Sequence, residues 1–90
     1  MQGTSSGPSF GLSGKRILVT GGASGIGKAA CKIFTDLGAN VCLSDVKADA
    51  IVEAAAETGA LAHVAADVSV PDQAERLISE TIAKLGGLDG

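Results

Sequence analysis

Residues 20–27 read TGGASGIG, and this glycine-rich stretch decides the fold. A short apolar run, residues 17–19, comes directly before it, and a segment with helical periodicity follows it. A glycine-rich turn between a strand and a helix is the setting in which a dinucleotide-binding fingerprint occurs. The stretch therefore predicts a phosphate-binding turn, with a plain strand-to-helix turn as the alternative.

Three glycines of this stretch have different physical roles. Gly21 permits a tight turn off the strand, Gly25 lets the backbone approach a pyrophosphate with no Cβ in between, and Gly27 lets the helix pack closely on the sheet. The N–H groups at the start of the helix would then face the phosphates, aided by the helix dipole. The residues expected to bind the cofactor here are Thr20, Gly21, Gly22, Ser24, Gly25, Ile26 and Gly27.

Strand and helix patterns alternate along the rest of the chain. Strands are expected at residues 17–19, 41–43 and 61–66, and helices at residues 26–37, 48–58 and 71–85. The apolar face of the first helix is expected to comprise Ile26, Ala29, Ala30, Ile33, Phe34 and Leu37. Such alternation predicts an α/β fold with a parallel sheet and right-handed crossovers. We expect the N-terminal half of a Rossmann-type, doubly wound domain, in the order β-α-β-α-β-α, with strand order 3-2-1 and helices on both faces.

An acidic residue follows the second predicted strand at the spacing that the fingerprint requires. Asp45 lies eighteen positions after Gly27, close to the ~20 positions usual for the residue that binds the adenosine ribose. A carboxylate there can accept hydrogen bonds from the ribose 2′- and 3′-hydroxyls, and it repels a 2′-phosphate. Asp45 therefore favours NAD over NADP as the cofactor, while an ordinary turn residue is the alternative.

Together these motifs resemble the classical short-chain dehydrogenases/reductases. The spacing within residues 20–27 is similar to the TGxxxGxG motif of that family, and residues 12–15, Leu-Ser-Gly-Lys, are similar to its lead-in to the first strand. Residues 85–90 resemble the segment that enters the family's fourth strand. The resemblance extends over almost everything from Leu12 onward.

The resemblance implies two further cofactor contacts. The Asp67 carboxylate would meet the adenine amino group, and the Val68 N–H would meet a ring nitrogen. Family members that prefer NADP often carry a basic residue just before the second motif glycine or just after the second strand. Ser24 occupies the first of these positions, and Lys47, which lies beyond Asp45, lacks the planar fork of an arginine. The resemblance thus also favours NAD.

The activity implied by the resemblance is that of a NAD(H)-dependent oxidoreductase, which interconverts an alcohol and a carbonyl by hydride transfer. In the family, an Asn-Ala-Gly segment, a catalytic Ser and a Tyr-x-x-x-Lys pair follow the fourth strand. This chain has no tyrosine, and its one asparagine, Asn40, precedes the second strand. We therefore assign no catalytic residue. Residues 12–90 are expected to form the N-terminal part of a NAD-binding Rossmann domain, inactive by itself.

Composition narrows the remaining possibilities. The chain is 46% apolar with a formal net charge of −3, which argues against nucleic acid or an anionic membrane as the partner. Cys31 and Cys42 do not suffice for a disulfide framework or a zinc site, so no metal is expected. Residues 1–11 are interpreted as a flexible leader without signal-peptide features. A cytoplasmic protein is expected, with an organelle matrix as the alternative.

Other functions are also compatible with these residues. A truncated isoform that binds dinucleotide or a partner without catalysis is one alternative. A methyl-donor-binding protein is another alternative, although residues 20–22 and 67–68 argue against it. A third is an epimerase-like relative, but the TGxxGxxG motif of those proteins requires a glycine where this chain has Ser24. The expected ligands are NAD(H) and, in the full-length parent, a small alcohol or carbonyl substrate. Because a chain ending at Gly90 would leave one edge of the first strand unpaired, we expect a homo-oligomer.

Overall fold

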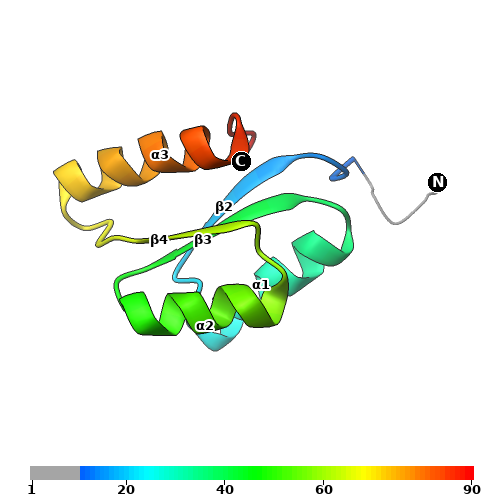
Figure 1. Cartoon of the computed structure of the whole chain (residues 1–90), viewed down its shortest axis with the longest axis horizontal. Helices are drawn as coiled ribbons and strands as arrows, with labels where there is room; N and C mark the ends of the chain where they lie inside the picture. The colour runs from blue at the N-terminus through cyan, green and yellow to red at the C-terminus, as the bar shows by residue number, and fades with distance from the viewer. Residues whose placement is uncertain (1–10) are drawn as a thin grey trace.

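Residues 11–90 are described by a computed structural model of the chain. They form strands and helices in the predicted β-α-β-α-β-α order (Figure 1). The elements are β2 (Arg16–Thr20), α1 (Gly25–Asp36), β3 (Asn40–Asp45), α2 (Ala48–Thr58), β4 (Ala62–Ala65) and α3 (Pro71–Leu85). The expected leader, residues 1–11, lies outside the described residues except for Gly11.

The three strands make one parallel sheet in the order β2-β3-β4, which is the predicted order 3-2-1. In the register, Thr20 of β2 lies beside Ser44 of β3, and Asp45 lies beside Ala65 of β4. The carboxyl ends of all three strands therefore meet at one edge of the sheet. Helices α1 and α2 cover one face and α3 covers the other, as Figure 1 shows.

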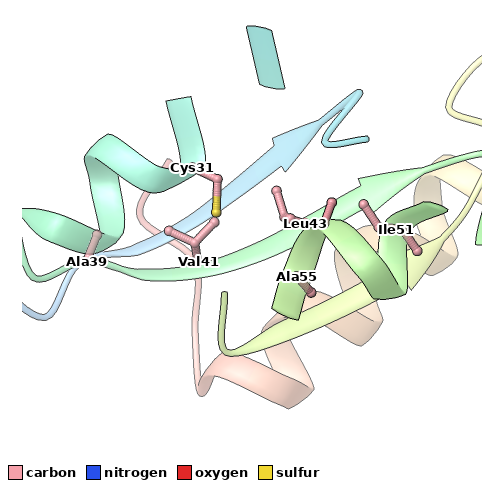
Figure 2. Packing of buried hydrophobic residues seen from close by; sticks show 7 residues of the cluster. Cys31, Ala39, Val41, Leu43, Ile51 and Ala55 are labelled. Atoms are coloured by element: carbon pink, nitrogen blue, oxygen red, sulfur yellow. The ribbon is translucent and has the colours of Figure 1, made fainter. Parts of the chain in front are cut away.

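The central strand β3 is buried on both faces, as expected for the middle of a parallel sheet. Its side chains alternate between two apolar clusters. Val41 and Leu43 pack toward α1 and α2, where Figure 2 shows them beside Cys31 and Ile51. On the α3 side, Cys42 packs in a second cluster, whose other buried members are Val64, Ala66 and Leu77.

Helix α1 is rotated relative to the prediction. Ile26, Ala29 and Ile33, expected in the core, are exposed, the two isoleucines at 87% and 57%, whereas Gly27 and Cys31 are buried. Phe34, also on the predicted face, does pack against the core. Gly27 has no side chain, so the helix approaches the sheet most closely along the row that contains it. Residues one turn apart share a face of a helix, and Cys31 therefore follows Gly27 into the core.

The edge of β2 that was expected to be unpaired is in part covered by residues 89–90. The Asp89 N–H donates to the Arg16 carbonyl at 2.7 Å, and the Leu18 N–H donates to the Gly90 carbonyl at 2.8 Å. The Arg16 guanidinium also pairs with the Asp89 carboxylate, Nε to Oδ2 at 2.9 Å. This ion pair holds residues 89–90 alongside β2.

Candidate functional site

The glycine-rich loop joins β2 to α1 and closes on itself. Gly21 has a φ of +67°, a left-handed conformation that a residue with a Cβ rarely adopts. Ser24 caps α1, since its Oγ accepts a hydrogen bond from the Gly27 N–H at 3.1 Å. The same Oγ donates to the Gly21 carbonyl at 2.7 Å, so the cap also braces the turn.

Three glycines of the loop differ in what surrounds them. A Cβ on Gly27 would overlap the Gly21 carbonyl oxygen, and a Cβ on Gly22 would lie 2.6 Å from Leu43 Cδ2. Internal packing therefore accounts for both of these glycines. A Cβ on Gly25 would meet nothing within 4 Å, and its φ lies outside the left-handed region. The space over Gly25 is open to a ligand.

The start of α1 presents unpaired donors beside this open space. Within residues 11–90, no hydrogen bond engages the N–H groups of Gly25 and Ile26. The first turn of α1 contains no acidic side chain. The positive end of the helix dipole is therefore not offset by a carboxylate on the helix itself, which suits the binding of an anion.

Asp45 ends β3 with its carboxylate against the loop. Oδ2 accepts a hydrogen bond from the Ala23 N–H, and Oδ1 accepts one from the Lys47 N–H, each at 3.1 Å. The Lys47 N–H is the main reason that the pKa of Asp45 lies below its ordinary value of 3.8; partial burial opposes this shift and the Ala23 N–H adds to it. The carboxylate is therefore ionised at neutral pH.

A groove of about 230 Å³ lies where the three strands end. It is lined by Thr20, Gly21, Ser44, Asp45, Val46, Ala66 and Val68. Four of these residues were predicted as cofactor ligands, whereas Ser44, Val46 and Ala66 were missed. Val46 and Val68 are 61% and 50% exposed. The groove thus combines one carboxylate with exposed apolar side chains.

Asp67 follows β4 and stabilises its own turn. Its Oδ1 accepts hydrogen bonds from the Ser69 hydroxyl at 2.6 Å and the Ser69 N–H at 3.0 Å, and these lower the pKa of Asp67. Ser69 therefore bonds to Asp67, and Val70 occupies the N-cap position of α3 without a side-chain bond. Val68 lines the groove, whereas Asp67 is not among its lining residues.

No group of three or more His, Cys, Asp or Glu side chains among residues 11–90 could hold a metal ion. None of the helices described is long and apolar enough to cross a membrane.

Comparison with known proteins places this geometry in a family context. A family model described as short chain dehydrogenase matches residues 15–90. The chain is 42% identical over 82 residues to 2,5-dichloro-2,5-cyclohexadiene-1,4-diol dehydrogenase of Sphingobium indicum, covering 88% of this chain and 32% of that protein. It is 39% identical over 84 residues to tropinone reductase-like 2 of Erythroxylum coca, covering 92% and 30%. The chain spans about a third of the length of these curated relatives.

Solved structures show the same similarity in three dimensions. A short chain dehydrogenase from Mycobacterium smegmatis superposes with a TM-score of 0.83 at 31% identity, over 87% of this chain and 35% of that chain. A hydroxysteroid dehydrogenase from Escherichia coli gives a TM-score of 0.82 at 32% identity, over 87% and 34%. The described residues therefore have the fold of the matched portion of these structures.

Proposed function

The chain belongs to the short-chain dehydrogenase family, and on this premise we propose that residues 12–90 bind the adenosine and pyrophosphate parts of NAD(H). The whole protein would then be an oxidoreductase that interconverts an alcohol and a carbonyl by hydride transfer. The observation that carries the proposal is the open space over Gly25, where a Cβ would meet no atom within 4 Å. A glycine that neither packing nor backbone conformation requires is explained by close approach of a ligand.

The pyrophosphate is proposed to lie over Gly25, against the unpaired N–H groups of Gly25 and Ile26. The Ser24 hydroxyl does not occupy these two donors, because it accepts its hydrogen bond from the next N–H group along the helix, that of Gly27. Two N–H groups and the positive end of a helix dipole together form the usual phosphate-binding arrangement of a Rossmann turn.

The adenosine is proposed to occupy the groove at the strand ends. Each oxygen of the Asp45 carboxylate accepts one backbone N–H and keeps a second lone pair for a ribose hydroxyl. Val46 and Val68, both exposed, would contact the faces of the adenine ring. Asp67 and the Val68 N–H would bind the polar edge of the ring, as the family resemblance implies.

NAD is the proposed cofactor in preference to NADP. The Asp45 carboxylate is ionised at neutral pH, and a 2′-phosphate on the ribose would place a second negative charge beside it. Lys47 is the nearest compensating cation, and its charge contributes to the lowered pKa of Asp45. Lys47 does not offset the whole cost, because the 2′-phosphate also replaces the 2′-hydroxyl, one of the two donors that the carboxylate would otherwise bind.

The chemistry divides between cofactor and protein. Bound nicotinamide would accept or donate the hydride, and the residues described here would hold and orient the dinucleotide. None of them is assigned a role in proton transfer, since the chain contains no tyrosine.

A second copy of the chain is the proposed protein partner. Ile26 and Ile33 of α1 and Ile78 and Ile82 of α3 are all exposed, between 41% and 87%. Exposed apolar residues gathered on helix faces favour association. Sedimentation velocity across a hundredfold range of concentration tests this, and a monomer throughout that range would contradict it.

Calorimetric titration of the chain with NAD⁺, NADP⁺ and ADP-ribose tests the cofactor proposal. ADP-ribose, which lacks nicotinamide, is expected to bind about as well as NAD⁺. NADP⁺ is expected to bind at least about tenfold more weakly, because of the like charges at Asp45. Absence of binding by all three ligands, or tighter binding of NADP⁺ than of NAD⁺, would contradict the proposal.

A further inference from the structure

The Asp45 carboxylate joins two segments of the site that are far apart in sequence. Oδ2 is bound to the Ala23 N–H in the glycine-rich loop, and Oδ1 is bound to the Lys47 N–H at the entry to α2, both at 3.1 Å. The loop has one other bond to β3, from the Gly22 N–H to the Ser44 carbonyl at 2.8 Å. The carboxylate therefore restrains the middle of the loop, next to the cap of α1.

We propose that Asp45 is a positioning residue for the glycine-rich loop in addition to a ribose ligand, so that one carboxylate couples the pyrophosphate and adenosine parts of the site. The inference rests on the proposed function, because it concerns how those two parts act together. It adds a role that ribose recognition alone does not require, since a ribose ligand need not touch the loop.

The coupling follows from the lone pairs of the carboxylate. Each oxygen directs one lone pair to a backbone N–H and has another available for a ribose hydroxyl. The backbone bonds hold the side chain in one orientation before a ligand arrives, so binding does not have to order it. They also hold Ala23 in place, and with it the turn that positions the free N–H groups of Gly25 and Ile26.

Asp45→Asn is a suitable perturbation, because it preserves size and shape. Asparagine has one carbonyl oxygen, so it can accept from Ala23 or from Lys47 but not from both, and its NH₂ group faces the other donor. The variant therefore loses one backbone bond in either orientation. Asp49→Asn is the matched control, since Asp49 is exposed in the first turn of α2 and the change in charge is the same.

The experiment crosses these variants with two ligands, ADP and 2′,3′-dideoxyadenosine diphosphate, in NMR-monitored titrations. Both ligands carry the diphosphate, but only ADP carries the ribose hydroxyls. Asp45→Asn is expected to lower the affinity for ADP by about tenfold or more and the affinity for the dideoxy ligand by about three- to tenfold. The dideoxy ligand is affected because the restraint on the loop is lost whether or not the ligand carries ribose hydroxyls. Asp49→Asn is expected to bind both ligands as the unaltered chain does.

The outcomes separate the two proposals. Equal affinity of the dideoxy ligand for the unaltered chain and for Asp45→Asn would overturn the positioning role and leave the cofactor proposal intact. Failure of the unaltered chain to bind ADP would contradict the proposed function and this inference with it.

A ligand-free measurement covers the case in which Asp45→Asn folds poorly. In the unaltered chain, the Ala23 amide resonance should shift in acid as the Asp45 carboxylate is protonated. The protection of that amide, measured as its exchange rate relative to the intrinsic rate at the same pH, should then fall. An Ala23 amide that shows no response to this titration would overturn the inference without any variant.

Discussion

Gly27 is the position at which one added methyl group is expected to damage the fold most. The Cβ of an alanine there would overlap the Gly21 carbonyl oxygen and would lie 2.8 Å from the carbonyl carbon of the same residue and 3.0 Å from the Gly22 Cα. All three are backbone atoms, which cannot rotate aside as the end of a side chain can. The clash is relieved only if α1 moves away from the sheet or the loop leaves its Ser24 cap.

The expected loss can be set against the stability of the chain. Overpacking a well-filled interior lowers the free energy of unfolding by about 1–3 kcal/mol. A clash with backbone atoms is expected to cost an amount near the upper end of this range. Alanine gains up to about 1 kcal/mol over glycine inside a helix, which offsets part of this cost. A net loss of about 2 kcal/mol is a large part of the roughly 5–13 kcal/mol available to a chain of this length. It corresponds to a fall in Tm of about 8–16 °C.

Gly25→Ala is the matched control, since it makes the same change in the same helix. Its Cβ would meet nothing within 4 Å, so the free energy of unfolding should stay constant or rise by up to about 1 kcal/mol. Urea unfolding followed by far-ultraviolet circular dichroism measures both variants. Equal urea midpoints for Gly27→Ala and the unaltered chain, or equal losses in the two variants, would refute the reasoning. Gly25→Ala should still weaken ADP-ribose binding.

Three further predictions concern the rest of the fold. Arg16 holds the pKa of Asp89 at about 2, below its ordinary value of 3.8. The ion pair therefore stabilises the fold fully at pH values above the pKa that Asp89 has in the unfolded chain, and this stabilisation is lost as the pH falls through the folded value of about 2. Asp89→Asn should therefore lower the urea midpoint at pH 7, and a difference from the unaltered chain that is as large at pH 2 as at pH 7 would contradict this origin. Leu43→Ala, at a side chain with 0% exposure, should cost about 2–5 kcal/mol in the same urea assay. Cys31 and Cys42 are fully buried, and burial raises the pKa of both thiols. The native protein should therefore resist a thiol reagent that labels both residues in urea. Rapid labelling of the native protein would contradict the burial of these two side chains.

The helix boundaries that could be predicted from sequence are those with a local cause. Helices α2 and α3 have the predicted bounds, because Gly59 and Gly86 end them in left-handed conformations with φ of +80° and +82°. Pro71 begins α3 at its first position, as predicted. The strands were predicted with less accurate ends. Arg16 and Thr20 are polar and were left out of β2, but strand pairing uses backbone groups and does not depend on side-chain polarity.

The candidate site was predictable where a motif carries it and not elsewhere. The glycines and Asp45 stand out because their spacing is visible along the chain. Ser44, Val46 and Ala66 line the groove only because strands distant in sequence end side by side, and no local pattern marks them. Ala23 was missed for another reason: it contributes its backbone N–H, which its side chain does not reveal.

The rotation of α1 shows why apolar periodicity alone misplaced Ile26 and Ile33, although it placed Phe34 correctly against the core. Two rows of the helix compete for the sheet, one through Ile26 and Ile33 and the other through Gly27 and Cys31. Hydrophobicity favours the first row, which would bury more apolar surface. Close approach favours the second, because a glycine lets the helix backbone reach the Gly21 carbonyl, where any Cβ would clash. The second row faces the sheet, with Gly27 against the Gly21 carbonyl and Cys31 fully buried, and the two isoleucines are left exposed.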